Sequence, residues 1–436
     1  MISTLPLVLV SLLAPQDAAP VSPSLREALG AARFLEASAI KTDAGLAWPA
    51  DPKDPKSVSL DLYAGSAGVV LFFLEAHHLT GRAEFRERAL AGADHLLASL
   101  DTLTSPEEQG LYTGLAGVGY TLATVYDATQ EEKYRAGART CARRLCERGQ
   151  PAGAGVAWSD TNDIIAGSAG IGLFLLDAAH RLDEPRCREV AVSAGKRLLE
   201  VSVEDGGQRK WPMNPTFPRL MPNFSHGTAG VAYFLATLYE ETKEQAFLDA
   251  AISGAKYLQS VAKTDRNTCV VFHDEPDGKD LYYLSWCHGP AGTARLFYRL
   301  AHVTGDQRWM EWVTRCAQGI EQSGIPDQLT PGFWNNVSQC CGSAGVAEFF
   351  LALHRLTKEA RYLQFARHVT DQITSKATHD GNASLWVQAE HRVKPELLVA
   401  QTGYMQGAAG IGLWYLHLEE FERGKTALVK LPDSPF

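Results

Sequence analysis

Two adjacent cysteines, Cys340 and Cys341, stand directly before a Gly-x-Ala-Gly turn, and the apolar stretch that follows the turn is typical of a helix. A second cysteine, in the motif Cys287-His288-Gly289, stands in the same relation to a similar turn. Side chains just before a helix lie near its N-terminal end, where the backbone favours negative charge. These positions therefore suit thiolates, and thiolates bind soft metal ions.

The Gly-x-Ala-Gly pattern recurs along the whole chain. Its seven copies begin at Gly65, Gly114, Gly167, Gly227, Gly289, Gly342 and Gly407. Each copy leads into a stretch that is apolar on all sides, and an amphipathic stretch separates each copy from the next. The amphipathic stretches cover residues 24–42, 84–100, 133–149, 186–203, 246–261, 308–323 and 361–375.

This alternation predicts an all-α fold. Helices that are apolar all round are buried, whereas amphipathic helices form an outer layer. We therefore expect an α/α toroid, or barrel, of seven inner and seven outer helices, with each inner helix opening on its Gly-x-Ala-Gly turn. Small residues at those turns allow seven backbones to converge near the axis.

His and Cys gather in consecutive units of the repeat. Directly before the first glycines stand Ala64, Thr113, Ala166, His226, His288, Cys341 and Gln406. One position earlier stand Tyr63, Tyr112, Ile165, Ser225, Cys287, Cys340 and Met405. Neighbouring units of a closed ring place equivalent atoms side by side, so we expect these thiols and imidazoles to converge at one mouth of the axis. Such a set predicts a zinc site.

Other interpretations of these cysteines remain open. Cys287 could form a disulfide with Cys340 or Cys341, or the thiols could be inert and buried. A purely structural zinc site would be closed by His226 or His288, whereas a catalytic site keeps one coordination position open. The remaining cysteines are expected to be buried small hydrophobic residues. They are Cys141, Cys146, Cys187, Cys269 and Cys316.

Two further patterns concern packing. Five of the long loops before the inner helices carry a tryptophan, and we expect these rings to plug the loops onto the barrel, with a substrate groove as the alternative. They are Trp48, Trp158, Trp211, Trp334 and Trp386. At the position three residues after the second glycine of each turn, only two of the seven units carry a charged residue. These residues are Arg295 and Glu348, and their units are neighbours. This register predicts an ion pair between them.

Charge and the N-terminus limit the partners and the compartment. The formal net charge is −9, the pI is about 5.8 and no basic run occurs, which disfavours nucleic acids and anionic membranes as partners. An apolar run from Leu5 to Ala14 precedes small residues, a pattern that predicts a signal peptide over residues 1–19 and a single domain over residues 20–436. A signal peptide implies export to the periplasm or out of the cell. The alternative is a cytoplasmic protein. No other segment is long and apolar enough for the membrane.

Taken together, the motifs resemble those of the lanthionine synthetase C-like (LanC-like) cyclase family. They are Trp286-Cys287-His288-Gly289, Cys340-Cys341-Gly342, Ser225-His226-Gly227 and Asp163-Ile164-Ile165-Ala166-Gly167. The resemblance extends over about residues 24–420 and implies zinc held by Cys287, Cys340 and Cys341, with a substrate thiol as the fourth ligand. Cys341 stands where the family usually has a histidine, which implies a three-cysteine subtype.

The resemblance also implies a reaction. The thiol of a peptide or a small molecule would add to the β-carbon of a dehydroalanine or dehydrobutyrine residue and form a thioether. By the same resemblance His226 would supply the proton, Asp163 would assist it and His288 would face the substrate. Asp163 is equally interpretable as a turn cap, and His288 as a structural histidine. Tyr283 stands where the family often has an arginine.

Two other classes of function are alternatives. A zinc-containing toroid could bind thiols or peptides without turnover. An α/α toroid could also be a glycosidase, but glycosidases need two carboxylates across the scissile bond. The predicted mouth concentrates sulfur and imidazole instead.

Overall fold

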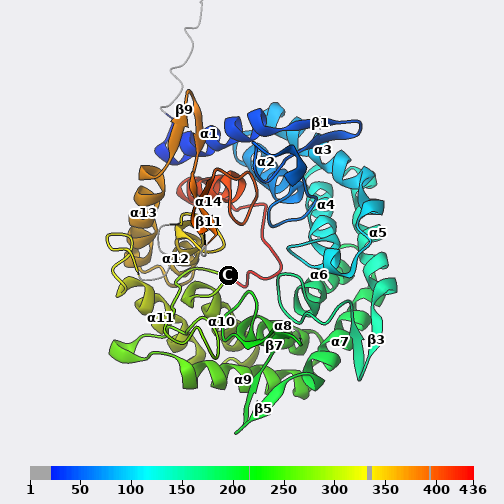
Figure 1. Cartoon of the computed structure of the whole chain (residues 1–436), viewed down its shortest axis with the longest axis vertical. Coiled ribbons are helices and arrows are strands. Elements are labelled where there is room, and N and C mark those ends of the chain that lie inside the picture. Colours follow the sequence, from blue (N-terminus) through cyan, green and yellow to red (C-terminus); the bar gives the residue numbers. More distant parts are fainter. Residues whose placement is uncertain (1–20, 216, 331–335, 392–393) are drawn as a thin grey trace, which may run out of the picture.

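Apolar and amphipathic helices alternate along the computed structural model, which describes residues 21–215, 217–330, 336–391 and 394–436. The apolar helices form an inner ring and the amphipathic helices surround it (Figure 1). Within the described ranges there are seven of each kind, so the predicted α/α toroid is confirmed. Residues 1–19, where a signal peptide is predicted, lie outside the described part.

The inner helices pack side by side around the axis. They are α2 (Ser66–Thr80), α4 (Leu115–Thr129), α6 (Ser168–Arg181), α8 (Thr228–Thr242), α10 (Pro290–Thr304), α12 (Ser343–Thr357) and α14 (Ala408–Glu422). The N-cap of each is the first glycine of a Gly-x-Ala-Gly turn, as predicted. Helix α14 packs on α2, so the inner ring closes.

Each outer helix packs on the inner helix that precedes it. The outer helices are α1 (Pro23–Ser38), α3 (Ala83–Ala98), α5 (Glu132–Arg148), α7 (Pro185–Glu200), α9 (Gln245–Val261), α11 (Arg308–Glu321) and α13 (Ala360–Ser375). The exception is α1, which packs on α14, so that the first and last helices of the toroid complete one another. Among the described helices, none is long and apolar enough to cross a membrane.

Short antiparallel hairpins decorate the long loops. The pairs are β1 (Ile40–Thr42) with β2 (Gly45–Ala47), β3 (Gln150–Ala152) with β4 (Gly155–Ala157), β5 (Val203–Asp205) with β6 (Gln208–Lys210), β7 (Pro212–Asn214) with β8 (Phe217–Leu220), β9 (Thr378–Asp380) with β10 (Ala383–Leu385), and β11 (Gln388–His391) with β12 (Lys394–Val399). The loops also hold the 3₁₀ helices η1 (Pro55–Ser57), η2 (Leu100–Thr102), η3 (Pro106–Gln109) and η4 (Asp265–Asn267).

The hairpins shorten two predicted outer helices. The helix expected over residues 24–42 ends at Ser38, because Ile40 pairs with Ala47 across a turn at Asp43 and Ala44, which is followed by Gly45 with a φ of +153°. Likewise, the helix expected over residues 186–203 ends at Glu200, and Val203 begins β5. The β-branched side chains of Ile40 and Val203 suit a strand better than a helix end.

Tryptophan anchors the loops in the way that the packing interpretation predicts. Trp48, Trp158, Trp211 and Trp386 are at most 6% exposed. Each indole N–H donates to a carbonyl near the end of the preceding outer helix, thirteen residues back, at 2.7 to 2.9 Å. The fifth, Trp334, lies outside the described residues. These four rings fasten their loops to the outer layer.

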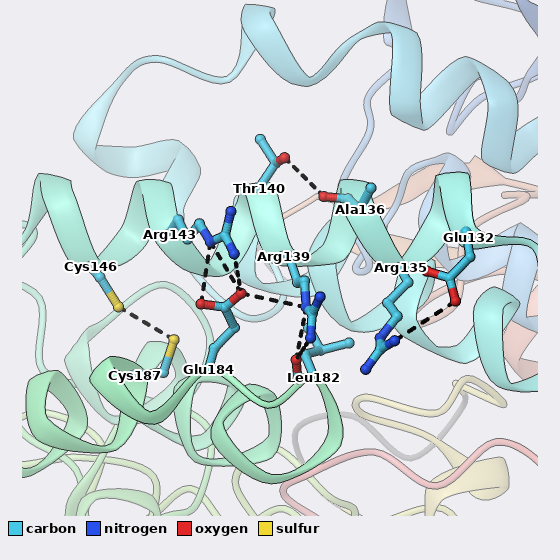
Figure 2. Close-up of polar contacts among 10 residues, drawn as sticks. All are labelled: Glu132, Arg135, Ala136, Arg139, Thr140, Arg143, Cys146, Leu182, Glu184 and Cys187. Carbon is cyan, nitrogen blue, oxygen red and sulfur yellow. Dashed lines mark hydrogen bonds and ion pairs between the residues drawn. The ribbon is translucent and has the colours of Figure 1, made fainter.

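Helices α5 and α7 make a polar contact in the outer layer, which Figure 2 shows. Arg143 donates to Glu184 with its Nη2 at 2.7 Å, and Arg139 donates to the carbonyl of Leu182. At one end of this contact the Sγ atoms of Cys146 and Cys187 lie 3.4 Å apart. These two cysteines, with Cys141, Cys269 and Cys316, are buried as predicted.

The second glycine of each Gly-x-Ala-Gly turn allows the loop to lie directly on the start of the helix. A Cβ on Gly292 would lie 1.9 Å from the carbonyl oxygen of Trp286, and one on Gly345 would lie 2.2 Å from that of Gln339. Since these obstacles are backbone atoms, no rotamer change relieves the clash. Glycine is needed here for close approach.

We predict that Gly292→Ala lowers the free energy of unfolding by about 1–3 kcal/mol or more, because the loop before α10 must move. Urea unfolding followed by circular dichroism measures this. Gly149→Ala is the control, since its φ is −58° and its Cβ would meet nothing closer than 3.6 Å. Equal stability of the two variants would contradict the close-approach argument.

Candidate metal centre

A closed ring of backbone hydrogen bonds lies at the face where the inner helices begin. The bonds join the residues just before the first glycines, and each N–H donates to the carbonyl of the next unit. The pairs are Tyr63 to Tyr112 (2.9 Å), Tyr112 to Ile165 (2.9 Å), Ile164 to Ser225 (3.2 Å), Ser225 to Cys287 (3.0 Å), Cys287 to Cys340 (3.0 Å), Cys340 to Met405 (2.9 Å) and Met405 to Tyr63 (2.8 Å). The ring fixes the register of all seven units.

This ring brings the three predicted sulfur ligands together. The Sγ of Cys341 lies 3.2 Å from that of Cys287 and 3.4 Å from that of Cys340. Cys287 and Cys340 are 2% and 4% exposed, while Cys341 is partly exposed. None of the three is in a disulfide. Their sulfurs form a cluster, and Cys341 is its most exposed member.

The donor set fits zinc. Tetrahedral zinc with Zn–S bonds of about 2.3 Å holds its sulfurs about 3.8 Å apart, so only a small outward movement of these side chains is needed. Hydrogen bonds from Cys287 and Cys340 hold the pKa of Cys341 well below its usual range, whereas burial raises the pKa of Cys287. Three adjacent cysteine side chains readily carry one negative charge among them. All three become thiolates only when a cation lies beside them.

Two polar residues that the sequence interpretation left out complete the cluster. The hydroxyl of Tyr63 donates to the Sγ of Cys340 at 3.4 Å, and the amide of Gln406 donates to the Tyr63 hydroxyl at 3.0 Å. Gln406 also lies 3.9 Å from the Sγ of Cys341. Gln406, in the seventh unit, stands at the repeat position of Cys341. Tyr63, in the first unit, stands at the repeat position of Cys340, and the first unit follows the seventh around the ring. The repeat register alone could therefore have found them.

Asp163 and His226 form a hydrogen-bonded pair beside the sulfurs. One carboxylate oxygen of Asp163 accepts the backbone N–H groups of Ala166 and Gly167, and the other lies 2.6 Å from His226 Nδ1. Asp163 therefore caps the turn before α6 and also contacts the imidazole of His226. Asp163 is 1% exposed, whereas the His226 side chain is 27% exposed.

His288 lies in a row of rings at the same mouth. Its ring stacks on that of His273 at 4.2 Å between centroids, and the rings of His226 and Tyr283 lie 5.7 and 5.6 Å away. Tyr283, at the position where an arginine was expected by resemblance, therefore packs against imidazoles. His273 in turn bonds to Asp274, 3.0 Å from its Nδ1. The row extends the polar mouth away from the sulfurs.

The C-terminal segment, residues 423–436, crosses to the middle of the ring, where Figure 1 marks the C-terminus. Asp433 is fully buried there. Its carboxylate accepts hydrogen bonds from the Trp286 indole and the Tyr112 hydroxyl, both at 3.1 Å. Because Trp286 directly precedes Cys287, the hydrogen bond from its indole to the buried Asp433 carboxylate helps to hold Cys287 in place.

The predicted ion pair between Arg295 and Glu348 is wrong. Arg295 instead donates to the backbone carbonyl of Asp433 at 2.9 Å and lies 3.3 Å from its carboxylate. Glu348 lies 2.7 Å from Nδ1 of His417. The repeat register places the two residues on neighbouring helices correctly, but the C-terminal segment provides a carboxylate that competes for the arginine. Arg295 and Glu348 both line a cavity of about 380 Å³ beside that segment.

Comparison with known proteins identifies the family. A family model described as lanthionine synthetase C-like protein matches residues 56–429. The chain belongs to the lanthionine synthetase C-like family. Within the solved structures, nisin cyclase matches this chain with a TM-score of 0.63 and 16% identity, over 89% of this chain and 92% of that one. The likeness shows that the two chains share a fold.

A curated relative in sequence is the glutathione S-transferase LANCL1 of Danio rerio. It is 24% identical over 341 residues, which cover 76% of this chain and 77% of that protein. The family match includes Asp163, His226, Cys287, Cys340 and Cys341, since all lie between residues 56 and 429.

We predict that Cys341→Ala weakens the thiolate-to-metal charge-transfer absorption of bound cobalt, because two sulfurs remain where three converged. Absorption spectra of the Co²⁺-loaded protein report sulfur ligation directly, and the metal affinity should fall more than the roughly 10- to 100-fold that loss of an outer-shell partner costs. Cys141→Ala, a buried cysteine of α5, is the control. An unchanged cobalt spectrum for Cys341→Ala would remove this sulfur from the metal centre.

We predict that Asp433→Ala lowers the free energy of unfolding by about 3–5 kcal/mol, since it leaves the partly buried Arg295 without its carboxylate. Chemical denaturation measures the loss. Ser434→Ala should change stability by no more than about 0.5 kcal/mol. If the two variants unfolded alike, the C-terminal segment would not be part of the folded core.

Proposed function

We propose that this protein catalyses the zinc-dependent addition of a thiol to a dehydroalanine or dehydrobutyrine residue, giving a thioether. The observation that supports this most is the convergence of three sulfurs on one point beside a hydrogen-bonded acid–imidazole pair. Three protein ligands with one open position are typical of a catalytic zinc site. Membership of the lanthionine synthetase C-like family points to the same chemistry.

Cys287, Cys340 and Cys341 would hold the zinc ion. When bound, zinc would supply the Lewis acidity that keeps an incoming thiol deprotonated at neutral pH. The three anionic ligands would leave the substrate sulfur electron-rich and therefore nucleophilic. Tyr63 would keep the side chain of Cys340 in place by donating to its sulfur.

The substrate sulfur then forms a bond to the β-carbon of the dehydro residue, and the electron pair of the double bond moves to the α-carbon and its carbonyl. A proton must reach the α-carbon. With Nδ1 of His226 donating to Asp163, Nε2 is the nitrogen that faces the substrate and delivers this proton. The proton that the thiol gave up restores the imidazolium, so the reaction consumes no other reagent.

The thiol could belong to the same peptide or to a separate molecule. Nisin cyclase is named for a cyclisation, while LANCL1 is named for transfer of glutathione, a free thiol. The same constellation serves both, because each joins a sulfur to an electrophilic carbon. We therefore propose a dehydroalanine-containing peptide as the electrophile. One assay compares the two sources of thiol, which are a cysteine of the same peptide and a separate thiol molecule.

A toroid that binds zinc and thiols without turnover is the second candidate. The exposed edge of Cys341 would allow a thiol to bind there without any acid or base. The pair formed by Asp163 and His226 has no role in pure binding, so its substitution distinguishes the two candidates. A dehydroalanine peptide with glutathione, beside the same peptide carrying its own cysteine, shows by mass spectrometry whether a thioether forms.

We predict that His226→Asn retains the metal but lowers the rate of thioether formation about 10²- to 10⁴-fold, as expected for loss of a general acid. Steady-state kinetics with parallel metal analysis measure both properties. His302→Asn, an exposed histidine bound to Glu240, should leave the rate unchanged. Full turnover by His226→Asn would exclude this imidazole from the reaction.

A further inference from the structure

A second cluster of ligand-type side chains lies at the other end of the inner helices. Glu75 and His78 belong to the last two turns of α2, and Glu420 belongs to the last turn of α14. The sulfur cluster lies just before the N-termini of the inner helices, so roughly 15 Å of helix separates the two ends. None of the three residues has a role in the thiol chemistry proposed above.

The spacing on α2 places two of these side chains on one face. Glu75 and His78 are three residues apart, and a Glu-x-x-His pair on a helix points both side chains the same way. Helix α14 packs on α2 and supplies Glu420 from the facing side. One ligand atom from each of the three residues lies within 4.8 Å of the others.

One fully buried group in this cluster lacks a hydrogen-bond partner. Glu420 is fully buried and neither of its carboxylate oxygens accepts a hydrogen bond. His417, one turn before Glu420, is 8% exposed, and its two ring nitrogens face carboxylates, with Nδ1 2.7 Å from Glu348 and Nε2 3.7 Å from Glu75. Buried carboxylates side by side require a proton or a cation between them.

The imidazole of His78 is already oriented as a metal ligand usually is. Metal-binding histidines commonly donate their second N–H to a carbonyl or a carboxylate. Nε2 of His78 lies 3.0 Å from the carbonyl of Thr426, which leaves Nδ1 as the lone-pair nitrogen. His78 is exposed, so an ion can reach the cluster from solvent.

We propose that Glu75, His78 and Glu420 bind a divalent transition-metal ion. Two carboxylates and one imidazole suit ions of the series from Mn²⁺ to Zn²⁺. This site is separate from the sulfur cluster and does not depend on the thiol chemistry.

The ion would fasten the C-terminal segment. The Glu75 carboxylate accepts the backbone N–H groups of Leu428 at 2.9 Å and Val429 at 2.6 Å, and His78 bonds to Thr426. A metal ion that fixes both side chains therefore also fixes the point where the segment leaves α14 and turns toward the axis. Asp433 lies further along the same segment, beneath the metal centre.

The test uses the full-length chain with Cys340→Ser and Cys341→Ser, so that the sulfur cluster no longer competes for metal. Titration with Mn²⁺, followed by the electron paramagnetic resonance signal of the free ion, should show one bound equivalent. Glu420→Gln should weaken that binding at least 10-fold. His77→Ala is the matched control, because this neighbouring, partly exposed histidine bonds to the Arg82 carbonyl and its replacement should leave binding unchanged.

Manganese should also raise the melting temperature of the cysteine variant and should not raise that of its Glu420→Gln derivative. If the cysteine variant does not fold, the same titration on the natural sequence, with and without the exposed substitution His78→Ala, replaces it, since Mn²⁺ prefers oxygen and nitrogen donors over thiolates. Absence of Mn²⁺ and Zn²⁺ binding at this cluster, or equal binding after Glu420→Gln, would overturn the proposal. The carboxyl pair would then be held by a shared proton only.

Discussion

The closed circle of backbone hydrogen bonds at the helix-opening face is the constraint on which the rest of the molecule depends. Six of the seven bonds join equivalent residues of successive units, the third unit donates from Ile164, one residue earlier, and the last unit returns to the first at Tyr63. Backbone groups near the axis have no access to bulk water, so they must pair with one another. Because the pairing involves no side chain, it leaves those side chains free to vary from unit to unit, and three consecutive units use that freedom for sulfur and imidazole.

Polar support for the metal centre comes from several directions. Tyr63 bonds to Cys340 from the first unit, Asp163 orients His226 from the third, and Asp433 holds Trp286 from the C-terminal segment. Each supporting group is itself buried or hydrogen-bonded, so the geometry of the mouth is set by many contacts and not by the ligands alone. The loops that contribute these residues are pinned in turn by buried tryptophans.

Most of the fold could be predicted from the sequence because it rests on a repeat. The glycines mark where each inner helix begins, and one register predicts that Cys287, Cys340 and Cys341 meet. What the repeat could not predict is whatever lies outside it. The C-terminal segment has no counterpart in other units, and nothing local in its charged, proline-containing sequence marks it as buried, so Asp433 as the partner of Arg295 was missed. The hairpins were missed for a similar reason, since they depend on single residues beside a turn, such as Gly45.

The packing of α1 on α14 and the seating of the last residues in the axis have a consequence for biosynthesis. The ring cannot close until α14 and the segment after it have left the ribosome, because they complete both the wall and the centre. Earlier units can form local helical hairpins during synthesis, yet their inner faces stay exposed until then. A nascent chain of this kind depends on being kept from aggregation until its end emerges, and a truncated product would lack a finished interior.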